Sequence, residues 1–267
     1  MVTLKILLLT SCMTMLFMYW VWVLAERINN YSIVDAAWAF CFFLQTAVFT
    51  YMAPTLTWPS LLFFALVSLW SLRLALFLAL RIRRHHPNED TRYQKLRSGY
   101  GPAYRMRFLL FYFLQGLSVS VLAAPFILVS FAQYQQISWL MMAGVVLFFL
   151  SLYGEFAADR QMSRFKAQPK NKGLVCDVGL WKYSRHPNYF FESCIWWSFY
   201  IFILGSSLSY WWAIYAPLII LYLLLKVTGV PPAEEQSLQS RGEAYREYQR
   251  RTSVFIPWFR SKQQDAL

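Results

Sequence analysis

Seven long apolar stretches dominate the sequence and limit what the chain can fold into. Most of them reach about 20 residues, the length with which an α-helix crosses the hydrocarbon core of a membrane. They cover residues 6–25, 31–52, 60–80, 108–131, 137–157, 189–204 and 208–227, of which 189–204 is the shortest. A soluble protein with so many buried helices would need amphipathic helices around them, and the sequence leaves none for this purpose. We therefore predict an all-α integral membrane protein, a seven-transmembrane-helix bundle with cytoplasmic loops and a C-terminal helix.

The basic residues predict the orientation of this bundle. Hydrophobic residues make up 58% of the chain and charged residues only 14%, which excludes an ordinary soluble enzyme and a disordered chain, yet the net charge is +12. Of the 25 lysines and arginines, 23 lie at Arg27 and within residues 81–107, 159–187 and 226–267, which seven spans place on one side. The positive-inside rule makes that side the cytoplasm, so the N-terminus faces outward and residues 228–267 form a cytoplasmic tail. Topology thus explains the charge, and no nucleic-acid partner is expected.

Other sequence features exclude several further kinds of protein. The first stretch is too long for the apolar part of a signal peptide, and no cleavage site of small residues precedes Glu26. The four cysteines form no CxxC pair and the three histidines form no cluster with them, so no metal site is expected. No GxGxxG fingerprint occurs, so a dinucleotide would be bound without a Rossmann fold. Without repeats or low-complexity segments, residues 1–267 are expected to form a single membrane domain.

Residues 179–192 form the densest polar cluster. Pro187 suits the first position of a helix, which would leave backbone N–H groups beside Arg185 and His186 and favour a phosphate or carboxylate. Asn188 and Glu192 are four residues apart, so they share one helix face and could both contact a polar ligand. The alternative is an interfacial anchor, because aromatic and basic residues are common at the level of lipid headgroups. Such an anchor requires neither Asn188 nor Glu192, which favours a ligand site.

Two other polar groups flank this cluster. Glu155 and Asp159 lie four residues apart at the end of the fifth span and could hold ribose hydroxyls or an amine, with phosphates over the basic residues that follow. The alternative is that they solvate the helix end, and the sequence supports both interpretations equally. Residues 231–249 are predicted to form one polar cytoplasmic helix, which would cover a ligand with the face that carries Arg241 or would simply be solvated.

Several segments resemble the bacterial membrane proteins of the steroid 5α-reductase-like superfamily, the DUF1295 group. The matching segments are residues 32–38, 69–74, 89–93, 179–192 and 246–258, and the most specific is Tyr-Ser-Arg-His-Pro-Asn-Tyr at 183–189 followed by Glu192. The resemblance extends over nearly the whole chain. It implies a seven-helix enzyme of the bacterial inner membrane that binds NADPH at its cytoplasmic end and reduces a C=C bond conjugated to a carbonyl. The substrate would be lipid-soluble, steroid-like or isoprenoid-like, and we expect a monomer.

The resemblance also implies roles for individual residues. Asn188 and Glu192 match residues at the nicotinamide end of the cofactor, Asp159 matches one near the adenosine portion, and Arg84 lies near the phosphates. Together with the polar clusters above, the expected cofactor-binding residues are Arg84, Glu155, Asp159, Arg164, Lys166, Tyr183, Arg185, His186, Asn188, Tyr189, Glu192, Glu235 and Arg241.

The chain departs from the steroid reductases where those enzymes hold their substrate. Cys41 and Phe42 stand in place of a Gln-Glu pair, and Trp70 in place of a substrate-facing tyrosine. Asp35, about two turns away in the same span, is the available proton donor, since burial among apolar residues would raise its pKa. We therefore expect Asp35 and Glu192 to be catalytic. An interhelical ion pair between Asp35 and Arg73 is an equally good interpretation.

A second enzyme class fits part of the same pattern. The Arg-His-Pro-x-Tyr element is similar to that of isoprenylcysteine carboxyl methyltransferases, which pair it with a later Glu-Glu, and this chain has Glu234 and Glu235. That similarity implies S-adenosylmethionine in place of NADPH. A transporter or structural membrane protein is a weaker alternative, because transporters concentrate polar residues at the membrane midplane and this chain gathers them at the cytoplasmic face.

Overall fold

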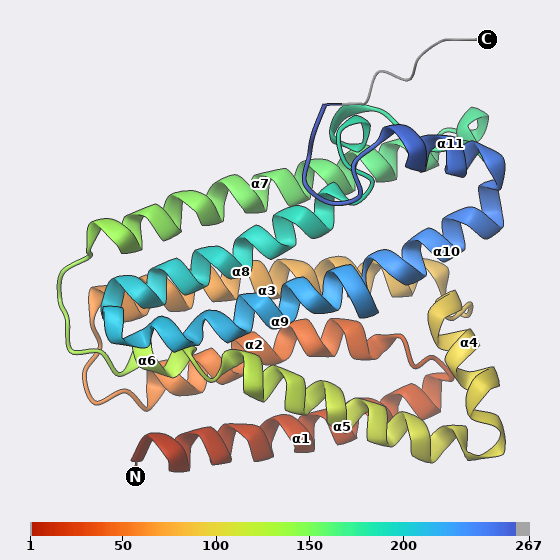
Figure 1. Ribbon diagram of the computed structural model, residues 1–267. Coiled ribbons are helices and arrows are strands. Elements are labelled where there is room, and N and C mark those ends of the chain that lie inside the picture. Colours follow the sequence, from red (N-terminus) through yellow and green to blue (C-terminus); the bar gives the residue numbers. More distant parts are fainter. Residues whose placement is uncertain (1, 260–267) are drawn as a thin grey trace. The chain divides into compact units, whose positions relative to one another are not determined.

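The computed structural model describes residues 2–259, which form helices and connecting segments without a β-strand (Figure 1). The helices pack as two compact units. The first comprises Met1–Trp139 and Gly205–Tyr210, and the second comprises Leu140–Leu204 and Trp211–Leu267. The predicted all-α fold is confirmed for the described part of the chain.

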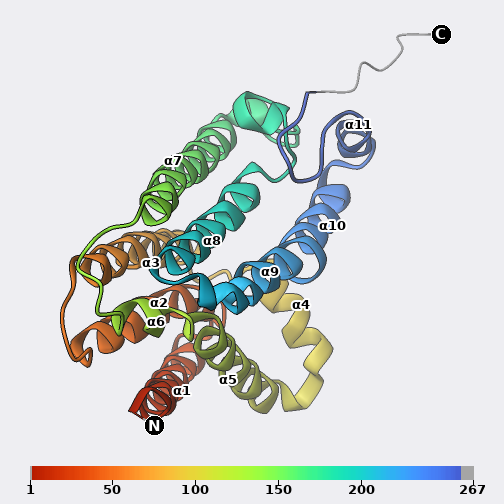
Figure 2. The same ribbon diagram turned by 60° about the vertical axis from the view of Figure 1, so that its left-hand side comes forward.

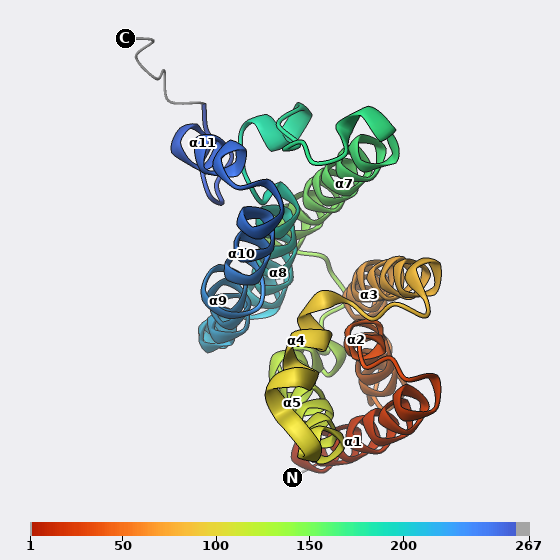
Figure 3. The ribbon, with the colours of Figure 1, turned by 90° about the vertical axis from the view of Figure 1, so that its right-hand side faces the viewer.

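The first unit is a bundle of long helices around α2. Its elements are α1 (Val2–Ile28), α2 (Ile33–Tyr51), α3 (Trp58–His85), α4 (Thr91–Tyr100), the 3₁₀ turn η1 (Gly101–Ala103), α5 (Tyr104–Ala123) and α6 (Phe126–Ser130). Helix α2 packs against α1, α3, α5 and α6, and an end-on view shows it among these helices (Figure 3).

Aromatic residues and one buried amide hold this bundle together. Phe42, Phe63 and Trp70 are fully buried between α2 and α3, and the rings of Phe42 and Trp70 lie 5.4 Å apart. The buried Gln45 amide donates to Thr14 Oγ1 of α1 at 2.8 Å and to the Ser120 hydroxyl of α5 at 3.0 Å. Since a polar group in an apolar interior must be hydrogen-bonded, Gln45 fixes three helices in one register.

Local sequence explains where the helices of the first unit begin. Thr57 and Ser60 form a reciprocal capping box at the start of α3, with Pro59 in its first turn. Asp90 caps α4 by accepting the Arg92 backbone N–H at 3.0 Å. These caps satisfy backbone groups that would otherwise remain unpaired at the helix ends.

In the described part of the chain, the second unit contains five further α-helices and several short turns. They are α7 (Trp139–Ala167), η2 (Pro169–Asn171), η3 (Gly179–Lys182), α8 (Pro187–Ser206), η4 (Leu208–Ile214), α9 (Tyr215–Tyr222), the π turn η5 (Leu223–Val227), α10 (Val230–Arg241) and α11 (Glu243–Arg251). Helix α8 lies between α7 and the α9–α10 pair (Figure 2).

Two glycines allow α7 and α8 to pack closely. A Cβ atom at Gly154 would lie 2.5 Å from the Phe191 ring, and one at Gly144 would lie 2.9 Å from the Ser198 carbonyl oxygen. Between these two points the rings of Phe148 and Phe199 meet at 5.7 Å. The two helices therefore run antiparallel in contact over much of their length, as small residues at helix interfaces permit in membranes.

Among residues 2–259, six helical segments are long and apolar enough to cross a membrane. They are Val2–Ile28, Ile33–Tyr51, Trp58–His85, Thr91–Ala123, Trp139–Ala167 and Leu208–Arg241. Six of the seven predicted stretches overlap these segments, which confirms a membrane-embedded protein in contact with lipid. The remaining stretch, 189–204, lies in α8, a 20-residue helix whose glutamate, tryptophans and tyrosines lower its mean hydropathy. The count of seven spans is therefore not confirmed.

The C-terminal tail differs from the predicted single helix over residues 231–249. The helix breaks at Gly242, whose φ of 55° lies in the left-handed region that favours glycine, and α11 begins at the next residue. Tyr245 and Tyr248 of α11 are buried, and burial together with the nearby Glu234 raises the pKa of Tyr245 to about 12. The described part of the tail thus packs within the second unit, and the Tyr245 phenol stays neutral.

Candidate functional site

The strongest candidate site lies where the C-terminal part of α7 meets the start of α8. Helix α7 contributes Glu155, which is 4% exposed, and Asp159, while α8 contributes Asn188 and Glu192. Glu155 follows Gly154, the glycine in contact with Phe191, and Glu192 follows Phe191. The two glutamates therefore lie at the same level of the antiparallel pair. The structure thus brings four predicted site residues to one place.

Hydrogen bonds define the position of the two α8 residues. The Asn188 amide nitrogen donates to Asp159 Oδ1 at 3.4 Å, and the Trp196 indole N–H donates to Glu192 Oε1 at 3.2 Å. The Asn188 Oδ1 atom is buried and accepts no hydrogen bond from any residue that the structure describes. A buried acceptor without a donor is costly, so this atom is suited to a ligand that brings an N–H or O–H group.

The loop before α8 is held firmly against α7. The Trp181 indole N–H donates to the Ala158 carbonyl at 2.9 Å, and the Leu180 N–H donates to Gln161 Oε1 at 2.8 Å. Gly179, with a φ of +57°, lies so close to Gln161 that a Cβ atom would meet the amide oxygen at 2.5 Å. These contacts fix the approach of the chain to Pro187 and hence the direction of Asn188.

Arg185 and His186 contact the C-terminal tail. The Arg185 Nε atom lies 2.7 Å from Glu234 Oε1, and Nη1 of the same guanidinium donates to the Gln249 carbonyl at 2.8 Å. His186 Nε2 lies 3.3 Å from the same Glu234 oxygen, and its ring stacks on Tyr189. The backbone N–H of His186 donates to Ser184 Oγ at 3.1 Å. The groups predicted to hold phosphates therefore fasten the start of α8 to α10 and α11.

The other predicted cofactor residues are more dispersed. Lys166 lies on the same face of α7 as Glu155 and Asp159, whereas Arg164 lies on the opposite face. Arg241 donates to the Leu174 carbonyl at 2.9 Å, Glu235 accepts from Gln239 at 3.0 Å, and Tyr183 lies beside Phe259. Arg84 is an exposed residue in the last turn of α3, in the first unit.

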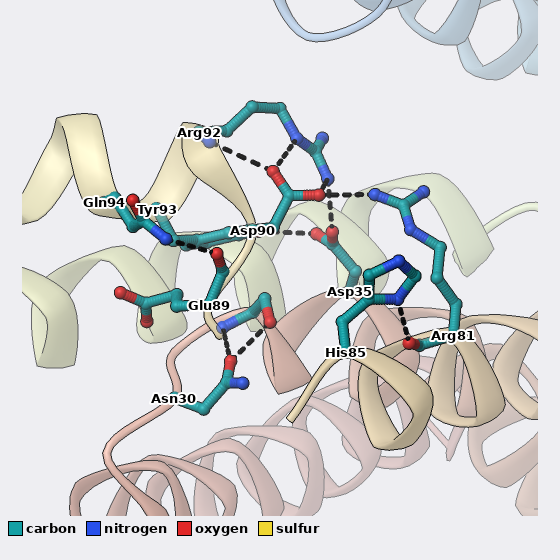
Figure 4. Close-up of polar contacts among 10 residues, drawn as sticks. Asn30, Asp35, Arg81, His85, Glu89, Asp90, Arg92, Tyr93 and Gln94 are labelled. Carbon is teal, nitrogen blue, oxygen red and sulfur yellow. Dashed lines mark hydrogen bonds and ion pairs between the residues drawn. The ribbon is translucent and has the colours of Figure 1, made fainter. Parts of the chain in front are cut away.

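Asp35 belongs to a separate polar network at the ends of the first-unit helices (Figure 4). Its Oδ2 atom accepts from Arg92 Nη2 at 2.9 Å and its Oδ1 atom accepts from the Tyr93 hydroxyl at 2.5 Å. The cation beside Asp35 is thus Arg92, where the sequence had suggested Arg73. Because both contacts use Asp35 as an acceptor, the residue is better placed to tie α2 to α4 than to donate a proton.

The rest of this network joins the loops between the helices. Asp90 pairs with Arg81 and with Arg92 Nε, the latter at 3.2 Å, and Glu89 accepts from the Tyr31 N–H at 2.6 Å and from Arg97 at 3.2 Å. Burial would raise the pKa of Asp90, but the two arginines outweigh it and hold the pKa below its ordinary value. The network is a charged brace between the ends of α1, α2 and α3 and the start of α4.

Comparison with known proteins establishes the family. Residues 21–252 match a family model described as "Protein of unknown function (DUF1295)". The chain belongs to the DUF1295 family. The matched part contains every predicted site residue of this DUF1295 protein, and the match confirms the DUF1295 resemblance seen in its sequence motifs. No curated protein and no solved structure matches the chain.

Three important residues of this DUF1295 protein were missed by sequence reasoning. Glu234, and not Glu235, contacts Arg185 and His186. Arg92 and Tyr93 of the long loop hold Asp35. Two adjacent glutamates cannot be distinguished from the sequence without knowing which face of α10 is covered. The segment Glu89-Asp-Thr-Arg-Tyr93 carries the family resemblance, but its spacing assigns no role to Arg92 or Tyr93. The described residues contain no group of three or more His, Cys, Asp or Glu that could hold a metal ion.

Proposed function

We propose that this protein is an NADPH-dependent membrane reductase of a C=C bond conjugated to a carbonyl in a lipid-soluble, steroid-like or isoprenoid-like molecule. The observation that carries the proposal is the buried Oδ1 atom of Asn188, which accepts no hydrogen bond from the described residues and lies beside Asp159. The carboxamide of a nicotinamide ring would supply the missing N–H donor. The resemblance of residues 179–192 to the steroid 5α-reductase-like enzymes points to the same contact.

The residues around Asn188 suit the polar groups of such a cofactor. Asp159, Glu155 and Glu192 offer carboxylate oxygens, which match ribose hydroxyls and the amide N–H groups of nicotinamide. Lys166 follows Asp159 by about two turns on the same face of α7, a suitable distance for a phosphate beyond the ribose. Arg185 and His186 contribute indirectly, because their contacts with Glu234 keep the start of α8 in place.

When bound, reduced nicotinamide supplies a hydride. The chain's own contribution would be orientation: Asn188 and Glu192 would hold the nicotinamide ring, and the Trp196 N–H donates to Glu192. A proton donor for the carbonyl is also needed, and Asp35, which was expected in this role, is engaged as an acceptor by Arg92 and Tyr93.

A methyltransferase is the second candidate, because the site is acidic. Glu155, Asp159 and Glu192 lie on the facing sides of α7 and α8, and such carboxylates would suit the ammonium and sulfonium charges of S-adenosylmethionine. The similarity of the Arg-His-Pro-x-Tyr element to isoprenylcysteine carboxyl methyltransferases supports this reading. The reductase accounts for the resemblance over nearly the full chain and is therefore preferred.

Thermal unfolding of the detergent-purified protein with NADPH or S-adenosylmethionine separates the two candidates. A ligand at about 100 times its Kd stabilises the native state by about 2.7 kcal/mol, which shifts the unfolding temperature measurably. We expect stabilisation by NADPH. Stabilisation by S-adenosylmethionine alone would support the methyltransferase, and a response to neither would contradict both enzymes.

Variants at Asn188 and Glu192 test the site itself. Asn188→Leu and Glu192→Gln should reduce the NADPH-dependent stabilisation and turnover by about tenfold or more, since each removes a hydrogen-bonding partner of the ligand. Glu247→Gln, the same chemical change on α11, serves as the control and should leave both unchanged. Normal stabilisation by NADPH in both site variants would refute the assignment.

A further inference from the structure

The outer face of α7 carries a hollow of about 320 Å³ that the proposed cofactor site does not use. Its lining residues all belong to α7: Tyr153, Phe156, Ala157, Arg160, Gln161 and Arg164. Residues three, four, seven, eight and eleven positions apart share one helix face, so the lining forms a continuous stripe. Glu155 and Asp159 lie on the opposite face, toward α8. The hollow is therefore distinct from the Asn188 site.

The stripe changes from apolar to basic toward the cytoplasmic end of α7. Tyr153 and Phe156 are 74% and 49% exposed, although both are large apolar side chains. Arg160 and Arg164 follow Phe156 by one and two turns, about 6 and 12 Å along the helix axis. In a helix that crosses a membrane, this order places the aromatic side chains at the edge of the hydrocarbon and the guanidinium groups at the level of the lipid phosphates.

Within residues 2–259, neither arginine has a carboxylate partner. Among the residues that the structure describes, Arg160 has one contact, with its guanidinium carbon 5.8 Å from the centre of the Phe156 ring, and Arg164 has no hydrogen bond or ion pair. The other described arginines of the second unit all contact an oxygen atom, namely Arg185, Arg241, Arg246, Arg250 and Arg251. Arg160 and Arg164, four residues apart on one face of α7, therefore differ from these arginines in contacting no oxygen atom of the described residues.

The wall of the hollow is preformed. Gln161 accepts the Leu180 N–H at 2.8 Å and is covered by Gly179, so the loop before α8 holds this side chain in place. The Arg160 guanidinium lies against the Phe156 ring, which restricts its direction. A ligand here would therefore meet oriented groups, which lowers the cost of binding.

We propose that this hollow binds an anionic phospholipid of the bilayer. The phosphate would lie between Arg160 and Arg164, whose forked donors match phosphate oxygens, and an acyl chain would run along Phe156 and Tyr153. The two positive charges match the anionic headgroup of such a lipid. The order of the lining residues, aromatic and then basic along α7, matches its acyl chain and its phosphate. The proposal does not depend on which cofactor binds at Asn188.

Lipid-dependent stability of the purified full-length protein tests the proposal. Thermal unfolding in detergent is measured with phosphatidylglycerol, with phosphatidylcholine and with glycerol phosphate, which carries the anion without acyl chains. We expect stabilisation by phosphatidylglycerol well above that by the other two. Equal effects of the two phospholipids would overturn the proposal, as would equal effects of phosphatidylglycerol and glycerol phosphate, which would indicate a site for free anions.

Paired variants assign the effect to this hollow. Arg160→Gln with Arg164→Gln should weaken phosphatidylglycerol binding about fivefold per arginine, from the usual contribution of a basic residue at an anionic membrane surface. Arg160→Lys with Arg164→Lys keeps the charge and should restore most of the binding, which shows that the fold is retained. The control, Arg246→Gln with Arg250→Gln, removes the same charge from α11. A preference for phosphatidylglycerol that survives in the glutamine variant, or falls equally in the control, would refute the site.

Discussion

Asp90 illustrates at the residue scale how the charged brace of the first unit depends on pH. Its pKa is lowered because Arg92 and Arg81 outweigh the effect of burial. The carboxylate therefore stabilises the fold at pH values above its ordinary pKa of 3.8, and this contribution is lost as the pH falls through the lowered folded-state value.

Asp90→Asn should remove this contribution together with part of the α4 cap, at a cost of about 1 to 3 kcal/mol near neutral pH. Thermal unfolding of wild type and variant should differ most at about pH 6, and the difference should shrink on acidification below about pH 4. Asp177→Asn, which affects a more exposed pair with Arg251, serves as the comparison and should show a smaller difference. A difference for Asp90→Asn that is constant with pH would show that the charge of Asp90 does not matter.

The sequence could predict which site residues share a helix face, because residue spacing alone determines this. Asn188 and Glu192 share a face of α8 because they are four residues apart, and Glu155 and Asp159 share a face of α7 for the same reason. That the two faces meet depends on Gly154 and Phe191, whose contact is a property of the packed structure. The partner of Asp35 could not be predicted either, since Arg92 lies 57 positions away along the chain.

At the scale of elements, the contact between α7 and α8 controls the site. Gly154→Ala would place a Cβ atom 2.5 Å from the Phe191 ring, a distance that forces the helices or the ring to move. We expect a loss of roughly 1 to 3 kcal/mol in stability, as is usual for overpacking, and weaker binding of NADPH because Glu155 and Glu192 flank the contact.

Gly116→Ala is the matched control for this prediction. Its Cβ atom would meet only the flexible side chains of Met15 and Met18, at 3.2 and 3.3 Å, so it should be tolerated far better. Thermal unfolding and NADPH titration of the two variants give the comparison. If Gly154→Ala were as stable as Gly116→Ala and bound NADPH normally, the close packing of α7 on α8 would not position the site.

Element boundaries also show what a hydropathy pattern can predict. The apolar stretches correctly predicted the long helices, because a segment of this length and composition can satisfy its backbone hydrogen bonds within a membrane only as a helix. The break between α10 and α11 was missed, since Gly242 within a polar segment is compatible with both a continuous and a broken helix. Likewise, α8 was counted as a span from its length, although its polar and aromatic residues keep it outside the six most apolar segments.

At the scale of the whole molecule, no sequence feature indicates the division into two units. The boundary at Trp139 falls at the start of an apolar helix, without a change in composition or a linker rich in proline, glycine or serine. Both units contain helices that are long and apolar enough to cross a membrane, so a boundary between the units leaves the hydropathy pattern unchanged. Only the packing of buried residues, which hydropathy does not record, separates the units.

Whether α8 crosses the membrane decides the topology of the whole chain. With seven spans, the basic residues of 81–107, 159–187 and 226–267 all lie on one side of the membrane. With only the six most apolar segments as spans, the seven basic residues of 226–267 would lie on the side opposite to those of 81–107. The positive-inside rule disfavours that arrangement, and the polar residues of α8 can be accommodated because they face α7 within the second unit. We therefore predict that α8 spans the membrane, with the N-terminus outside and the C-terminus in the cytoplasm.

Reporter domains that are active in only one compartment, fused in turn at each terminus and at the loop around Gln135, provide the measurement. Cytoplasmic activity at the C-terminus with external activity at the N-terminus and at Gln135 is expected, whereas both termini on one side would show that α8 does not cross.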